Sequence, residues 1–127
     1  MPGSLLYGFG DALRSLFTGE NECSKDLSKL KVNFEIYELY LTGYATKMKK
    51  TLTKKEIELL PLSVFLMTIE VGMRFLDDFL RGDVYFKIHN EDDNLTRART
   101  QITLSKDIYN NLDLLNKKTK EIIDKII

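Results

Sequence analysis

The chain has 127 residues, of which 43% are hydrophobic and 30% are charged. This length and apolar content are typical of one folded domain with a buried core, and they exclude a disordered chain. The 19 basic residues balance the 19 acidic ones, so no net charge attracts nucleic acid or anionic lipid. We therefore predict a single helical domain over residues 1–127, with neither a nucleic-acid nor a membrane partner.

Few groups are suited to metal, redox or nucleophilic chemistry. The single cysteine, Cys23, cannot form an intramolecular disulfide, and one histidine, His89, is too little for a metal site. Gly8 and Gly10 lack the further glycine and the lysine of a phosphate-binding loop. The chain begins without the basic region of a signal peptide, and charges interrupt the apolar segment 59–80. We predict a cytoplasmic protein whose chain holds no catalytic residue, metal or cofactor.

The first third of the chain predicts two helices. A short helix is expected over 12–17, with Asp11 near its N-cap and Gly19 beyond its end. After a polar loop, a second helix is expected over 33–50, because apolar residues recur there at spacings of three or four. Its stripe consists of Phe34, Tyr37, Leu41, Tyr44 and Met48.

The most apolar segment predicts the central helix. Thr53 and Glu56 have the spacing of a capping box, which marks a helix start. Pro61 predicts a kink or a restart, since proline cannot donate the backbone hydrogen bond. From there the helix is expected to run to Arg81 and stop at Gly82. Apolar residues cover most of its circumference, so we expect it to be the most buried helix. Its polar strip consists of Glu70, Arg74, Asp77, Asp78 and Arg81.

The remainder predicts a loop and a last helix. Residues 83–89 include strand-forming types, but no second strand is available to pair with them, so we predict an ordered extended loop. Asp92, Asp93 and Asn94 offer an N-cap for one long terminal helix, whose apolar stripe continues to Ile126. The expected fold class is therefore all-α, with about four to five helices and a long terminal helix.

Arg74 is the most informative charged residue, because it projects from a helix that is otherwise mostly apolar. It could form an ion pair with Glu70 or Asp78, or it could bind an oxygen-rich ligand, and the residues alone leave both open. Tyr85 lies in the following loop, where its ring could pack or form the wall of a sugar site. Arg97, Arg99 and Gln101 lie near the start of the last helix, and their expected use is pairing with the Asp92-Asp93 loop.

Four groups of residues in the sequence resemble one family when taken in order. They are Met1-Pro2-Gly3 with Gly10-Asp11; Leu59-Leu60-Pro61; Glu70-Val71-Gly72-Met73-Arg74-Phe75-Leu76 with Gly82-Asp83-Val84-Tyr85-Phe86; and His89, Asn94-Leu95 and Arg97-Ala98-Arg99-Thr100-Gln101. We call these the four motif strings. They resemble the C-terminal region of the aminoglycoside phosphotransferase-like superfamily, specifically bacterial N-acetylhexosamine kinases, often labelled mucin desulfatases. The resemblance covers nearly the whole chain.

The resemblance implies the helical, acceptor-binding lobe of a protein-kinase-like fold. In that family the catalytic loop and the magnesium-binding aspartate precede the Met-Pro-Gly string, so ATP and magnesium are implied for a full-length relative and not for this chain. Gly8 departs from the family, where an aspartate is usual. The positions that carry over face the acceptor sugar: Arg74 and Tyr85 as polar contacts, and Phe17 as an apolar wall.

Two functions follow as expectations. One is the amino-sugar-binding portion of an ATP-dependent sugar phosphotransferase, inactive by itself, with a truncated or separately encoded N-terminal half. The alternative is a stand-alone helical interaction module without a kinase role. Either predicts a homodimer, because a lobe without its other half exposes apolar surface. The expected dimer contacts are Leu13, Leu16, Phe17, Phe34, Tyr37 and Leu41.

Overall fold

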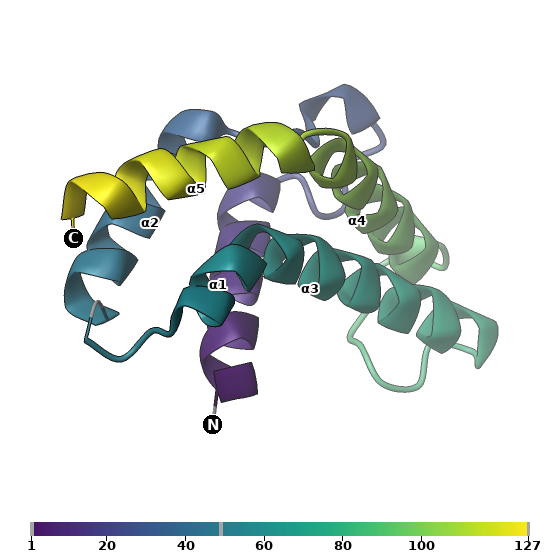
Figure 1. Cartoon of the computed structure of the whole chain (residues 1–127). Coiled ribbons are helices and arrows are strands. Elements are labelled where there is room, and N and C mark those ends of the chain that lie inside the picture. The colour runs from purple at the N-terminus through teal and green to yellow at the C-terminus, as the bar shows by residue number, and fades with distance from the viewer. Residues whose placement is uncertain (1, 49, 127) are drawn as a thin grey trace.

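The computed structural model describes residues 2–48 and 50–126, with side chains from Leu6 onward. This part of the chain is helical and contains no strand, which confirms the all-α prediction and the extended loop after the central helix. In chain order its elements are α1 (Pro2–Thr18), the short 3-10 helix η1 (Leu27–Lys29), α2 (Phe34–Met48), α3 (Lys54–Leu80), α4 (Asp93–Asn110) and α5 (Leu112–Ile126). α3 packs against α1, α4 and α5, while α2 and α5 lie side by side (Figure 1).

α1 is longer than predicted, since it begins at Pro2 rather than near Asp11. Proline is well suited to a first helical turn. Gly10 then lies inside the helix, where it allows close contact with α3: a Cβ there would be 2.4 Å from the Ser63 carbonyl oxygen. This contact offsets the conformational cost of an interior glycine. The predicted end is correct, because Gly19 follows Thr18 with a φ of 54°.

α2 confirms the second predicted helix with an end two residues earlier. The Asn33 side chain accepts a hydrogen bond from the Ile36 amide at 3.1 Å, as an N-cap residue does. Tyr37 and Leu41 from the predicted stripe are fully buried within the chain, as is Leu13 of α1. The prediction that these three residues form a dimer surface is therefore wrong.

α3 confirms the capping box and the central position, but two predictions about it are wrong. The Thr53 amide donates to Glu56 at 2.9 Å, and the Glu56 amide donates to the Thr53 hydroxyl at 3.1 Å. Of the kink or restart predicted at Pro61, the restart is wrong, because Pro61 is buried within one continuous helix. Apolar residues do not make α3 buried all round either, because Met73 is 61% exposed and Leu80 is 74% exposed. Only one face of α3 packs into the fold.

The predicted long terminal helix is in fact two helices. They are separated at Asn111, which caps α4 and whose side-chain amide donates to the Asp107 carbonyl at 2.7 Å. The break turns α5 back onto α2, where the hydroxyls of Tyr37 and Thr119 are 2.5 Å apart. A single straight helix would carry its apolar residues away from α2.

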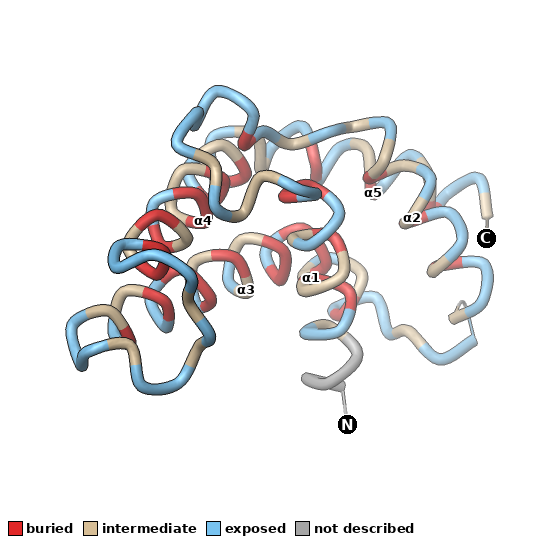
Figure 2. Tube along the Cα trace, turned by 180° about the vertical axis from the view of Figure 1, so that it is seen from behind, coloured by how far each residue is buried: buried red, intermediate tan, exposed pale blue. Residues whose placement is uncertain are grey.

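The buried residues form two clusters of unequal size. The larger one, which we call the apolar core, joins α1, α2, α5 and parts of α3 and α4; it includes Phe9, Leu13, Tyr37, Leu41, Leu60, Val64, Leu104, Ile108 and Leu115. The smaller cluster consists of Val71, Phe75 and Ala98, between α3 and α4. Figure 2 shows the buried positions on the inner faces of these helices, with exposed positions outside.

α3 is also long and apolar enough, by those two criteria alone, to cross a membrane. Nearly half of its most apolar window is buried inside the fold. Asp78, near its end, is buried and hydrogen bonded by the following loop. These features are those of the core helix of a small soluble helical protein.

Candidate functional site

Two motif strings meet at the end of α3, where a buried aspartate holds the loop that follows. The Asp78 carboxylate accepts hydrogen bonds from the amides of Tyr85 at 2.8 Å and Phe86 at 3.0 Å. The side-chain amide of Asn94 donates to the same carboxylate at 2.8 Å. Burial alone would raise the pKa of Asp78, but these donors, with the Val84 amide, lower the pKa below its ordinary value of 3.8. Asp78 is therefore a charged anchor for the loop.

We call residues 81–92, which join α3 to α4, the strap. Its first turn uses two left-handed residues, Gly82 with a φ of 93° and Asp83 with a φ of 62°. Asp83 tolerates this conformation better than a branched residue would. Its amide donates to the Asp78 carbonyl at 2.8 Å, and its carboxylate accepts from the Asn94 side chain at 2.9 Å. The turn is thereby fixed to both helices.

A second buried aspartate holds the other end of the strap. The Asp93 carboxylate accepts from the backbone amides of His89 at 2.8 Å and Asn90 at 3.0 Å. Chiefly through the His89 amide, these bonds lower the pKa of Asp93 below 3.8. The expected N-cap residue Asp92 makes no side-chain capping bond, so the carboxylate next to it anchors the loop instead.

Arg97 connects the strap to the loop after α1. Its Nη1 donates to the Lys87 carbonyl at 3.0 Å and to Asn94 Oδ1 at 3.1 Å. Its Nε lies 3.4 Å from Glu22 Oε1, and its guanidinium carbon lies 5.7 Å from the centre of the Phe75 ring. The predicted pairing of Arg97 with the Asp92-Asp93 loop is right only in part: the charge of Arg97 helps to lower the pKa of Asp93, but its ion pair is with Glu22.

A further contact joins the first and fourth motif strings. Arg14 forms an ion pair with Asp11 at 3.0 Å and donates to Gln101 Oε1 at 3.2 Å. The Gln101 side-chain amide donates in turn to the Thr18 hydroxyl at 3.1 Å. Gln101 thus binds α1 and not the Asp92-Asp93 loop. We call Arg14, Asp78, Asn94, Arg97 and Gln101 together the polar seam.

The structure does not bring the three predicted sugar-binding residues into one pocket. Arg74 is exposed on α3 and makes no hydrogen bond or ion pair with the rest of the described chain, so the alternative of a pair with Glu70 or Asp78 is absent. Tyr85 is 81% exposed on the strap, and its ring contacts Phe86 edge-on at 4.8 Å. Phe17 is buried in the apolar core, and it also lines an open depression of about 510 Å³ beside α2.

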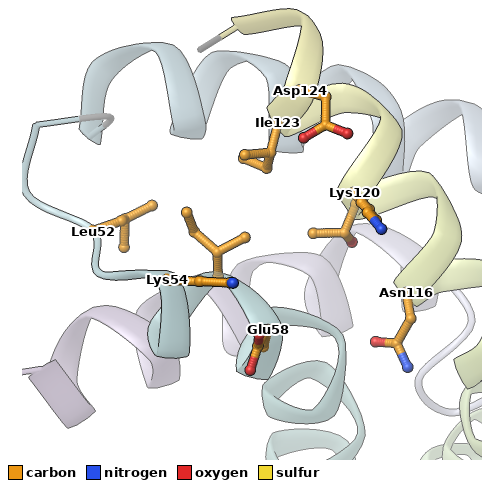
Figure 3. Close-up of a pocket in the computed structure, with 9 residues that line it drawn as sticks. Leu52, Lys54, Glu58, Asn116, Lys120, Ile123 and Asp124 are labelled. Carbon is orange, nitrogen blue, oxygen red and sulfur yellow. The ribbon is translucent and has the colours of Figure 1, made fainter.

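A further depression, of about 720 Å³, lies elsewhere, between the start of α3 and α5. Leu52 and Ile123 lie on opposite sides of it, and Lys54, Glu58 and Lys120 are among its polar lining residues (Figure 3). None of the three predicted sugar-binding residues lines it. Acid and base are balanced at its rim, so its lining selects no charge class of ligand.

Among the described residues, no group of three or more histidine, cysteine, aspartate or glutamate side chains is placed to hold a metal ion. No protein-family model matches the chain. What sequence reasoning missed is the scaffold role of Asp78, Asn94 and Gln101. An available signal was their position on faces that otherwise carry buried residues, because polar residues at core positions require partners.

Proposed function

We propose that this chain is the acceptor-binding helical portion of an ATP-dependent sugar phosphotransferase that resembles N-acetylhexosamine 1-kinase. By itself it is inactive, because in that family the residues that position magnesium and the reacting hydroxyl precede the motif strings. Its partners would be an amino sugar and an N-terminal kinase half, and its compartment the cytoplasm.

The observation that carries the proposal is the interlocking of the motif strings. They were recognised as separate stretches of sequence, yet Arg14 beside the first string contacts Gln101 of the fourth at 3.2 Å. Asp78, between the two halves of the third string, binds Tyr85 and Asn94. Residues that resemble one family therefore support one another in one scaffold, as motifs of a common fold should.

In this proposal the scaffold presents Arg74 and Tyr85 to the sugar. The Arg74 guanidinium is exposed and unpaired within the described chain, so it can donate hydrogen bonds to sugar hydroxyls or to an N-acetyl carbonyl. Tyr85 offers an exposed ring face and a hydroxyl from the strap. Phe17 lines a separate depression that neither Arg74 nor Tyr85 lines, so it is not part of this sugar contact.

Saturation-transfer NMR with N-acetylglucosamine and N-acetylgalactosamine tests the sugar contact. We expect weak binding by the chain, lost in Arg74→Ala and reduced in Tyr85→Phe. Arg99→Ala, which removes another exposed arginine, should leave the signal unchanged. Equal signals from Arg74→Ala and from the unaltered chain would remove Arg74 from the site.

A coupled phosphorylation assay tests the inactivity of the chain alone. We expect no ATP-dependent turnover of N-acetylhexosamines, and turnover when an N-terminal kinase half is supplied. Turnover by the chain alone, abolished by a substitution in it, would contradict the proposal.

The alternative is a helical interaction module that works through protein contacts. It is favoured by the apolar residues that α3 exposes, because a contiguous apolar surface on a small protein marks an interaction site. A reading frame for a kinase half immediately upstream would favour the phosphotransferase, whereas failure of the chain to activate any such half would favour the module.

A further inference from the structure

α3 carries a second apolar face, on the side away from the core. We call it the α3 stripe, and it consists of Leu62, Leu66, Ile69, Met73, Leu76 and Leu80. Four of its members are exposed: Leu62 by 38%, Leu66 by 45%, Met73 by 61% and Leu80 by 74%. Ile69 and Leu76 between them are half-buried, and Leu76 also packs against the smaller buried cluster. In Figure 1 no other helix lies in front of α3. The four exposed members of the stripe are therefore accessible to another molecule.

The spacing of the stripe is that of a helix-pairing seam. Its members follow one another at intervals of four and three residues, and this alternation keeps side chains on one line along an α-helix. An α-helix advances by about 100° per residue, so the stripe projects opposite the buried line of Val64, Thr68, Val71 and Phe75. α3 thus has one apolar face for its own fold and a second one with coiled-coil spacing.

Charged residues flank the stripe on one side in an alternating order. We call Glu70, Arg74, Asp77 and Arg81, all exposed, the charged strip. From Glu70 to Arg81 the charges run acid, base, acid, base. In the opposite direction they run base, acid, base, acid. Two such strips placed side by side in parallel bring like charges together, whereas antiparallel placement brings each acid next to a base. The charge pattern is therefore complementary to a reversed copy of itself.

We propose that the α3 stripe binds a second copy of this chain, with the two α3 helices antiparallel about a twofold axis near residues 74 and 75. Met73 then packs on Leu76 of the partner subunit, and Ile69 packs on Leu80 of the partner subunit. Glu70 lies beside Arg81 of the partner subunit at each end. A twofold arrangement covers the part of each stripe from Ile69 to Leu80 at once and leaves no open end for further growth.

This interface is different from the contacts expected from the sequence, and it goes beyond the proposed sugar site. It is built from one helix of each copy, so its area lies at the low end for stable complexes. The dimer should accordingly form at micromolar concentration.

Sedimentation equilibrium measures the dimer directly. The unaltered chain should dimerise, and Met73→Glu should weaken dimerisation at least about tenfold, because it places a charge in the middle of the seam. Leu39→Glu is the matched control: Leu39 is 69% exposed on α2, away from the stripe, and its substitution should leave the dimer intact. A circular-dichroism spectrum of each variant checks that the helices are retained.

A charge exchange tests the direction of pairing. Glu70→Arg alone should weaken the dimer, because the new arginine meets Arg81 of the partner subunit. The double variant Glu70→Arg with Arg81→Glu restores an acid next to each base and should recover the dimer. A monomeric unaltered chain, an equal loss in Leu39→Glu, or no recovery in the double variant would overturn the proposal. Because Arg74 lies near the twofold axis of this dimer, sugar binding is compared in monomeric Met73→Glu, which keeps Arg74, Tyr85 and Phe17, so that its failure is distinguishable from failure of the dimer.

Discussion

The apolar core joins all five helices, whereas the polar seam joins only α1, α3 and α4, and the two hold the helices together by different means. In the core, Leu13, Leu41 and Leu115 are fully buried, and one hydroxyl pair, Tyr37 with Thr119, is added to them. In the seam, Asp78 and Asn94 are as deeply buried, but each is surrounded by hydrogen-bond donors or acceptors at fixed directions. The core requires apolar side chains that fill the available volume, which many sequences can do. The seam requires hydrogen-bond donors and acceptors in fixed directions, which few sequences provide. The motif strings that resemble a family lie at and around the seam.

The largest effect should come from removing volume in the core. Leu13→Ala leaves a cavity among α1, α2 and α3 residues, and it should lower the free energy of unfolding by about 2–5 kcal/mol. Urea unfolding followed by circular dichroism measures the change. Leu16→Ala, three residues later and 47% exposed, should cost much less. Equal losses in the two variants would show that the core does not depend on Leu13 for its packing.

An intermediate effect is expected where α1 crosses α3. Gly10→Ala places a methyl group 2.4 Å from the Ser63 carbonyl oxygen, so the two helices must separate. We expect a loss of about 1–3 kcal/mol in the free energy of unfolding. Gly43→Ala is the control, since nothing lies within 4 Å of its added methyl group on α2. It should stabilise the chain by about 0.5–1 kcal/mol through helix propensity. Destabilisation by both variants would contradict the close contact at Gly10.

The same contrast explains what could be predicted from the sequence. The apolar core follows from apolar patterning: the stripe that begins at Phe34 predicts α2, the apolar segment 59–80 predicts α3, and the capping box at Thr53 marks a helix start. Periodicity could not show that α3 exposes one apolar face, because the burial of a face depends on how many partners the helix finds. It also could not show the turn at Asn111, because both halves of the last stripe are apolar.

The candidate site was less predictable than the core. Asp78 and Arg74 both belong to the predicted polar strip, yet Asp78 is buried and Arg74 is exposed. The difference arises from the strap, whose amides turn back toward Asp78 only after Gly82 and Asp83 adopt a left-handed conformation. A contact that depends on a turn geometry leaves no periodic trace in the sequence. The contact between Arg97 and Glu22, which are 75 positions apart, likewise leaves no periodic trace in the sequence.

The last prediction concerns how stability falls in acid, where the two regions differ in chemistry. At neutral pH the effect is the smallest of those predicted. Asp78 and Asp93 have pKa values below the ordinary 3.8 in the folded chain, because backbone amides bind their charged forms. Above about pH 5, more than one unit above the ordinary pKa of 3.8, these carboxylates are ionised in both states, and their contribution to stability is complete. As the pH falls further, the unfolded chain takes up protons first, so the free energy of unfolding falls as the folded pKa values are approached.

Urea unfolding at pH 7, 4, 3 and 2 should therefore show a steeper acid loss for the unaltered chain than for Asp78→Asn or Asp93→Asn. Asparagine keeps one acceptor oxygen for the strap but has no charge to lose, so the stability gap between each variant and the unaltered chain should narrow toward pH 2. Leu13→Ala should be weaker than the unaltered chain by the same amount at every pH, because a cavity binds no proton. Parallel acid losses in Asp78→Asn, Asp93→Asn and the unaltered chain would mean that direction and charge in the seam matter no more than volume, and the distinction between the two regions would fail.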